Sequence, residues 1–205
     1  MKKDERVDKP DGFSKWQKIA IGIAIVCGFT MWYLYGFWDV IHPSKKQSSN
    51  GYYAARKSLI QKLVVDPSVL YPVVRVIDGD TFVAKIANQD ITVRVLGENA
   101  PETVKPKWPI ECYGPEASEE DKKLLIGHSV RLEIDPTQDK VDYYGRLLAY
   151  VHIDDGLFLE EYMIQNGFAR EYTFNQKKPY RYQKQFLSDQ SEAQKEKIGL
   201  WGKCL

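Results

Sequence analysis

Apolar and polar positions from Tyr71 onward predict five β-strands. Runs rich in β-branched and aromatic residues begin at Tyr71, and several of them alternate apolar with polar residues. Turn residues in "DGD" and "ANQD" separate the first three runs, as they would in consecutive hairpins. The predicted strands are "YPVVRVI", "TFVAKI", "ITVRVL", "SVRLEI" and "RLLAYVHI".

Three further segments have the pattern of helices. "GPEASEEDKKLLIG" places a proline in its first turn, acids early, lysines late and Gly127 at its end. "LFLEEYMIQNG" is amphipathic and stops at Gly167, and "YRYQKQFLSDQSEAQKEKIG" is a long final helix ending at Gly199. Five strands, with one helix before the fourth and others at the end, indicate an α+β fold built on a five-stranded OB-fold barrel.

The N-terminal part of the chain has a different pattern. Residues 19–38 include no charged side chain and are long enough to cross a hydrocarbon core of roughly 30 Å. A buried core helix or a cleaved signal peptide is the alternative. A core helix is seldom apolar on every face, and "YGFWDVIHP" offers no cleavage site of small residues. The pattern therefore predicts a single transmembrane helix in contact with the lipid bilayer.

The predicted organisation has four parts. A basic tail (1–18) precedes the anchor (19–38), and a polar linker (39–65) leads to the main domain (66–205). Within the linker, "AARKSLIQKLV" forms a short helix or continues the linker. Six Lys/Arg precede the anchor and four follow it within 20 residues, which favours a cytoplasmic N-terminus and an extracytoplasmic main domain.

Charge is unevenly distributed between these parts. Residues 1–65 hold 11 Lys/Arg against 5 Asp/Glu, whereas residues 66–205 hold 18 against 23. An acidic domain does not attract a polyanion through its overall charge, so any such binding needs local arginines or a bound cation.

Two of the three cysteines lie in the main domain. In an extracytoplasmic domain Cys112 and Cys204 are candidates for a disulfide, and the alternative is two unrelated thiols. No His or Cys stands near them at the spacing of a zinc site. We interpret the scattered histidines as having no catalytic role: His42, His128 and His152.

Four short stretches carry candidate chemistry. They are "DGDT" (78–81), "VRVLGENAPET" (93–103), "YGPEAS" (113–118) and "DYYGRLLAY" (142–150). Taken one at a time, each stretch has a purely structural explanation. The first is a hairpin turn, the second a strand arginine followed by a turn, the third the start of a helix, and the fourth a turn with an arginine that opens a strand. Together, in this order and spacing, they resemble the thermonuclease (staphylococcal nuclease-like) family over roughly residues 71–201. The family also has a charged final helix that leads into a tryptophan, and "DQSEAQKEKIGLW" has the same pattern in this chain.

The resemblance implies an OB-fold nuclease that uses Ca²⁺ to hydrolyse phosphodiester bonds in DNA and RNA. It implies that Arg94 and Arg146 clamp the phosphate and that Glu102 orients or deprotonates the attacking water. These residue types suit the chemistry. Guanidinium groups bind phosphoryl oxygens bidentately at any working pH, and a carboxylate serves as a general base.

The resemblance also implies a cation site. Asp80 and Asn99 would be ligands together with the backbone carbonyl of Ala100, and Asp78 would lie in the outer shell. The family usually has aspartate at the position of Asn99. An amide oxygen still ligates Ca²⁺ but brings one negative charge fewer, so we expect weaker cation affinity, with another divalent metal as the alternative.

Tyrosines provide candidate nucleotide contacts. The resemblance implies this role for Tyr144 and Tyr172, while Tyr143 stands where the family often has lysine. Stacking on an aromatic ring tolerates any base. The alternative for these tyrosines is packing at the barrel mouth.

A second function remains open, namely a weakened module that binds nucleic acid or a protein without cutting. Such modules usually lose the two arginines and the glutamate, whereas this chain keeps Arg94, Glu102 and Arg146. Its acidic domain also lacks the basic balance of an electrostatic binder. The sequence therefore favours catalysis and identifies no protein partner.

Overall fold

The computed structural model describes residues 45–103 and 109–204. The predicted transmembrane anchor and basic tail lie outside the described residues. Within the part that is described, no helix is both long and apolar enough to cross a membrane. The chain divides into two units, Met1–Gly51 and Tyr52–Leu205, and the second unit is described below.

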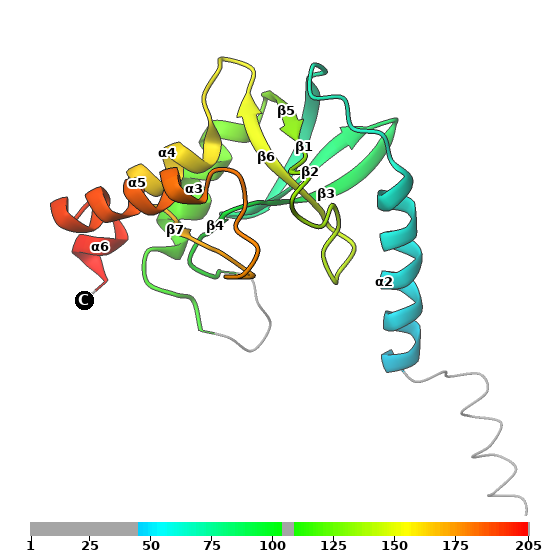
Figure 1. Cartoon of the computed structure of the whole chain (residues 1–205), viewed down its shortest axis with the longest axis horizontal. Helices are drawn as coiled ribbons and strands as arrows, with labels where there is room; N and C mark the ends of the chain where they lie inside the picture. The colour runs from blue at the N-terminus through cyan, green and yellow to red at the C-terminus, as the bar shows by residue number, and fades with distance from the viewer. Residues whose placement is uncertain (1–44, 104–108, 205) are drawn as a thin grey trace, which may run out of the picture. The chain divides into compact units, whose positions relative to one another are not determined.

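A closed five-stranded barrel forms the centre of this unit (Figure 1). Its strands follow the order β1-β2-β3-β6-β5, and neighbours are antiparallel except for the parallel pair β3 and β6. The predicted α+β fold with a five-stranded barrel is confirmed. The bounds are β1 Tyr71–Asp78, β2 Thr81–Ile86, β3 Gln89–Val95, β5 Ser129–Glu133 and β6 Leu147–Ile153.

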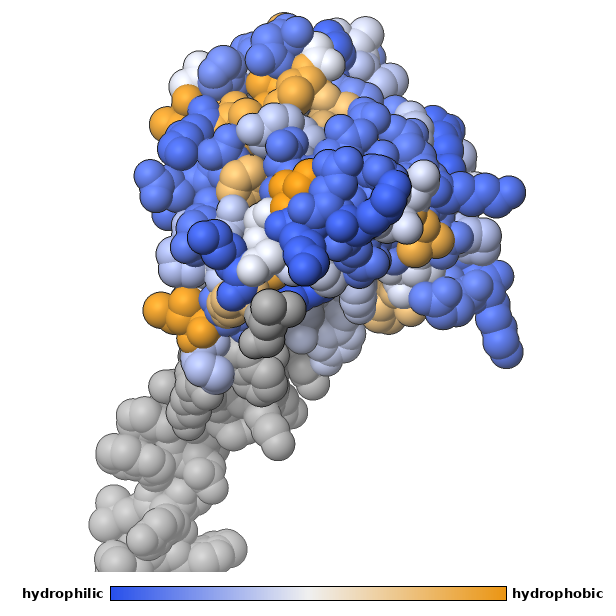
Figure 2. All heavy atoms as spheres, turned by 90° about the vertical axis from the view of Figure 1, so that its left-hand side faces the viewer, coloured by the Kyte–Doolittle hydropathy of each residue, from blue (hydrophilic) through white to orange (hydrophobic). Residues whose placement is uncertain are grey.

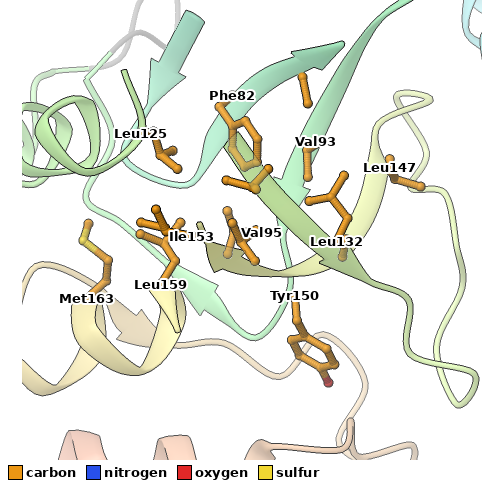
Figure 3. Packing of buried hydrophobic residues seen from close by; sticks show 14 of the residues in the cluster. Phe82, Val93, Val95, Leu125, Leu132, Leu147, Tyr150, Ile153, Leu159 and Met163 are labelled. Carbon is orange, nitrogen blue, oxygen red and sulfur yellow. The ribbon is translucent and has the colours of Figure 1, made fainter. Parts of the chain in front are cut away.

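The barrel interior is filled by apolar side chains that alternate along the strands. Phe82, Val93, Leu132 and Leu147 have no exposed surface, and Figure 3 shows Phe82, Val93 and Leu132 close together. Each such side chain contributes about 1.5–3 kcal/mol through burial. Because successive strand residues point to opposite faces, one set fills the barrel, and the other set combines polar side chains with buried residues such as Val83 and Tyr150.

The three helices predicted after the third strand are present with shorter bounds, and the short helix α6 was not predicted. The bounds are α3 Gly114–Leu125, α4 Leu159–Gln165, α5 Gln183–Glu196 and α6 Leu200–Lys203. The final helix does not run to Gly199 but ends at Glu196, where Lys197 adopts a left-handed φ of 57°. Gly199 serves close packing instead, because a Cβ there would lie 2.4 Å from the carbonyl oxygen of Gly167.

Helix α5 presents charged residues to solvent and buries only Phe186 and Ala193. Figure 2 views the end of the unit that carries α5 and α6, and this face is largely hydrophilic with small separate apolar groups. A face of this kind indicates a solvated surface.

Two short strands were not predicted as such. Strands β4 (Glu98–Asn99) and β7 (Arg170–Glu171) form a separate two-stranded sheet. This pairing places Asn99 opposite Arg170 and brings Tyr172, which follows β7, beside Gly97.

Helix α2 (Lys45–Lys62) occupies most of the segment predicted as a linker. The helical alternative for "AARKSLIQKLV" is therefore confirmed through Lys62. Ile60 of α2 is only 1 % exposed, so the helix is fixed to the barrel's apolar core.

The structure joins Cys112 and Cys204, whose Cα atoms are 5.7 Å apart, across 92 positions of sequence. Cross-links that close loops of this length remove chain entropy from the unfolded state. We expect reduction to lower the free energy of unfolding by about 4–5 kcal/mol. Urea unfolding with and without a reductant measures this difference.

The control for this experiment is the double variant Cys112→Ser with Cys204→Ser. Its unfolding midpoint should match that of the reduced protein and should not respond to reductant. Equal midpoints for oxidised and reduced wild-type protein would contradict the expected contribution.

Candidate active site

A cleft of about 920 Å³ brings together every residue for which the sequence suggested a catalytic, cation-binding or nucleotide-binding role. Its walls come from the β1–β2 turn, the end of β3 with the loop that follows, the turn before β6 and the segment after β7. The lining includes Asp78, Asp80, Arg94, Asn99, Ala100, Glu102, Tyr144, Arg146 and Tyr172.

The β1–β2 turn packs directly on the loop after β4. A Cβ on Gly79 would lie 2.7 Å from the Cβ of Ala100, so no larger residue fits without a shift. Thr81 begins β2 opposite Arg94 of β3 in the hairpin register. The Asp-Gly turn therefore places Asp80 beside both Arg94 and the loop that carries Asn99.

Arg94 connects the two side chains that the sequence suggested as cation ligands. Its Nη2 lies 3.0 Å from Oδ2 of Asp80 and donates to Oδ1 of Asn99 at 3.1 Å. Nη1 donates to the carbonyl of Val95 at 2.9 Å. Since both oxygens contact one nitrogen, they are at most about 6 Å apart.

Arg146 is held by Asp142 through two bonds. Oδ2 of Asp142 accepts from Nε at 2.6 Å, and Oδ1 accepts from the backbone N–H of Arg146 at 2.8 Å. The guanidinium also lies 5.4 Å from the centroid of the Tyr144 ring. Asp142 opens one of the four short stretches, but the sequence alone predicted no role for it. Its signal was the acid–arginine spacing of four.

Thr81 links the two arginines. Its Oγ1 donates to Oδ1 of Asp80 at 2.8 Å and accepts from Nη1 of Arg146 at 3.4 Å. A continuous series of polar contacts therefore runs from Arg146 through Thr81 and Asp80 to Arg94. Sequence reasoning did not identify this role of Thr81.

The loop that carries Glu102 is fixed from two sides. Asp78 accepts from the Thr103 hydroxyl at 2.5 Å and from its backbone N–H at 3.3 Å. Glu102 and Glu111 are joined by a backbone bond of 2.9 Å and by a bond of 3.2 Å from the Glu102 N–H to the Glu111 carboxylate. Asp78 thus positions the Glu102 loop.

Known proteins are similar to this chain over the segment that carries most of the cleft residues. The family model of the staphylococcal nuclease homologue matches residues 92–203. The chain belongs to this family. The match covers both arginines and Glu102 within one continuous stretch.

The chain is similar to proteins named thermonuclease and endonuclease and to one uncharacterized protein. A thermonuclease of Staphylococcus hyicus is 41% identical over 131 residues, covering 64% of this chain and 75% of the relative. Endonuclease YncB of Bacillus subtilis is 38% identical over 130 residues, covering 63% and 60%. The uncharacterized protein MJ1439 of Methanocaldococcus jannaschii is 30% identical over 176 residues, covering 75% and 83%.

The groups that the sequence suggested as cation ligands offer oxygen atoms only. Across the described ranges, no three His, Cys, Asp or Glu side chains converge on a possible metal position. The candidate set instead combines one carboxylate, Asp80, with the amide of Asn99 and the carbonyl of Ala100. Such a set suits a hard cation such as Ca²⁺, which accepts carbonyl and amide oxygens and completes its shell with water.

Two buried carboxyl groups lie behind the cleft of the nuclease homologue. Burial raises the pKa of Glu98 and of Asp121 well above the ordinary range, and nearby carboxylates, Asp80 among them, add to both shifts. The neutral form is favoured in each case.

Tyr180 also supports the cleft, although the sequence alone predicted no role for it. It is 5 % exposed, and its hydroxyl donates to the carbonyl of Gly97 at 3.1 Å. The same carbonyl accepts from the backbone N–H of Tyr172 at 2.9 Å. Tyr180 thus fixes the segment that places Tyr172, whose ring is 46 % exposed, at the cleft.

Proposed function

We propose that the chain is a Ca²⁺-dependent nuclease that hydrolyses phosphodiester bonds in DNA, RNA or both. Relatives named thermonuclease and endonuclease support the reaction class. The observation that carries the proposal is the convergence of Arg94, Arg146 and Glu102 in one cleft. Two guanidinium groups can stabilise the negative charge of the phosphodiester while a nearby carboxylate acts on the attacking water.

Arg146 has the geometry of a phosphate clamp. Asp142 holds its Nε side, and within the described part of the chain no hydrogen bond occupies its Nη2. Its side chain is 29% exposed, compared with 11% for Arg94. A guanidinium held in this way can donate to phosphoryl oxygens without reorganising as charge develops in the transition state.

Glu102 is the group that we assign to the water. Asp78 and Glu111 hold its loop on either side, so the carboxylate has a fixed backbone from which to act. A carboxylate in this position accepts a proton from water or aligns the water with the phosphorus atom.

The chemistry of the donor set fits Ca²⁺. Asp80, Asn99 and the Ala100 carbonyl would hold the ion, which when bound polarises a phosphoryl oxygen and lowers the pKa of a bound water. Arg94 contacts the same Asp80 and Asn99 oxygens and so keeps them close together.

The change Asn99→Asp should tighten Ca²⁺ binding by about tenfold. A charged oxygen in place of a neutral one, about 2.4 Å from a cation, adds more than about 1.4 kcal/mol even at high dielectric. Isothermal titration calorimetry with Ca²⁺ measures this directly. Gln194→Glu on the exposed face of α5 changes the net charge equally and should leave affinity unchanged. Equal affinity in Asn99→Asp and wild type would remove Asn99 from the ligand set.

The activity itself is tested with the full chain in detergent. Single-stranded DNA and RNA are incubated with increasing Ca²⁺ and, separately, Mg²⁺, and products are resolved by size. Cleavage that requires Ca²⁺ supports the proposal. Intact substrate at every metal concentration, with the barrel folded, would favour a module that binds nucleic acid or a protein without cutting.

We further propose that residues 19–38 anchor the chain in a bilayer, with its N-terminus in the cytoplasm and the nuclease unit outside. The charge distribution around this segment supports that orientation. The Cys112–Cys204 disulfide suits an oxidising compartment. Protease added to intact cells should digest the nuclease unit, and full protection of that unit would contradict the orientation.

A further inference from the structure

Four tyrosines form a cluster where helix α2 meets the turn before β6. Tyr52 and Tyr53 come from α2, and Tyr143 and Tyr144 come from the turn. Neighbouring ring centroids are 5.3 to 6.4 Å apart. Three of the rings are strongly exposed: Tyr52 by 59%, Tyr143 by 69% and Tyr144 by 52%. Gathered exposed aromatic rings are typical of a binding surface.

Arg56 fixes this tyrosine cluster in place. Its Nε donates to the carbonyl of Gly145 at 3.1 Å, its Nη1 donates to the Tyr52 hydroxyl at 3.1 Å, and its Nη2 donates to the Thr92 hydroxyl. A Cβ on Gly145 would lie 2.9 Å from Cγ of Arg56, so the helix and the turn are in close contact. The rings are therefore ordered before any ligand arrives, which reduces the entropy cost of binding.

The tyrosine cluster continues directly from the cleft. Tyr143, Tyr144 and Lys57 line the cleft together with Arg146. The guanidinium of Arg146 also lies against the Tyr144 ring. A strand whose phosphate contacts Arg146 would therefore reach the rings without crossing another surface.

Local charge supports a polyanion at this position. Between Tyr52 and Lys62, helix α2 carries Arg56, Lys57 and Lys62 and no acidic residue. The barrel and its helices are acidic overall, with 18 Lys/Arg against 23 Asp/Glu in residues 66–205. Aromatic rings beside a local excess of positive charge are the combination that binds single strands, because bases stack and phosphates pair with cations.

We propose that the tyrosine cluster is an additional site for single-stranded nucleic acid. It stacks bases beyond the nucleotide whose phosphate contacts Arg94 and Arg146. The inference rests on the proposed function and extends it, because it makes helix α2 part of the substrate-binding surface. Stacking requires unpaired bases, so the site favours single strands over duplexes.

The test compares two substrates with the full chain. One is a single-stranded oligonucleotide of about ten nucleotides, and the other is a chromogenic phosphodiester of one nucleotide, which is too short to reach the cluster. In Tyr52→Ala we expect kcat/KM to fall about tenfold for the oligonucleotide and to stay unchanged for the short substrate. Tyr52→Phe keeps the ring, loses the hydroxyl contact with Arg56, and should match wild type on both substrates.

Two other results for Tyr52→Ala would contradict the inference. Equal losses on both substrates would show that the cluster only holds the turn before Arg146, and the inference would be wrong. No loss on either substrate, with an active wild type, would also overturn it while leaving the proposed function intact.

An inactive wild type would instead contradict the proposed function. The inference is then tested by binding of fluorescent oligothymidylate to wild type, Tyr52→Ala and Tyr52→Phe. Weaker binding in Tyr52→Ala alone supports the site, and equal binding in all three proteins overturns it.

Discussion

Replacing Arg146 with alanine should reduce kcat by about 10²–10³-fold, the usual cost of losing one fixed donor to developing transition-state charge. The reason lies in how the side chain is held. Asp142 engages the Nε edge and the backbone, and this leaves the far edge of the guanidinium directed to the substrate. Steady-state kinetics on single-stranded DNA, with circular dichroism as a check of folding, measures the effect.

Two further variants separate position from charge. Arg146→Lys keeps a positive charge but loses the planar fork, so its activity should remain well below wild type. Arg75→Ala removes an exposed arginine from β1 outside the cleft and should leave kcat unchanged. Full activity in Arg146→Ala would exclude the clamp role.

Replacing Glu102 with glutamine should lower kcat by about 10²–10⁴-fold, the range expected for removing a general base. The substitution keeps the shape of the side chain. The loop should stay in place because its bonds to Asp78 run through Thr103 and its bonds to Glu111 run through the backbone. The expected result is therefore a catalytic loss with little change in substrate binding or in melting temperature.

Glu119→Gln on the exposed side of α3 is the matched control and should behave as wild type. Rapid-mixing experiments with one turnover separate chemistry from product release. An unchanged single-turnover rate in Glu102→Gln would show that another group handles the water.

Local sequence patterns were enough to predict the five barrel strands. The candidate site residues came from the family resemblance of four short stretches, and the structure places them in one cleft. Strand periodicity and turn residues are short-range signals, and the five predicted strands are present. The candidate residues lie at the ends of these strands or in the loops between them. Asp80 lies in the β1–β2 turn, Arg94 is near the end of β3, and Arg146 directly precedes β6. Strand order then brings them together.

Contacts between distant residues could not be predicted in this way. Arg56 and Gly145 are 89 positions apart, and neither residue carries a local pattern that indicates its partner. Strands β4 and β7 are two residues long, which is too short to show periodicity. Asp142 and Thr81 act through other side chains, so their roles became visible only from the geometry.

The parallel pairing of β3 with β6 has a consequence for how activity appears during folding. Arg94 lies on β3 and Arg146 directly precedes β6, and the registered contacts Val93–Leu147 and Arg94–Leu148 span 54 positions. The hairpins β1–β2 and β2–β3 can form early because their strands are adjacent in sequence. Pairing of β3 with β6 must await closure of a long loop. During refolding, nuclease activity should therefore return with barrel closure, at the slowest folding phase, and should lag behind the recovery of hairpin structure.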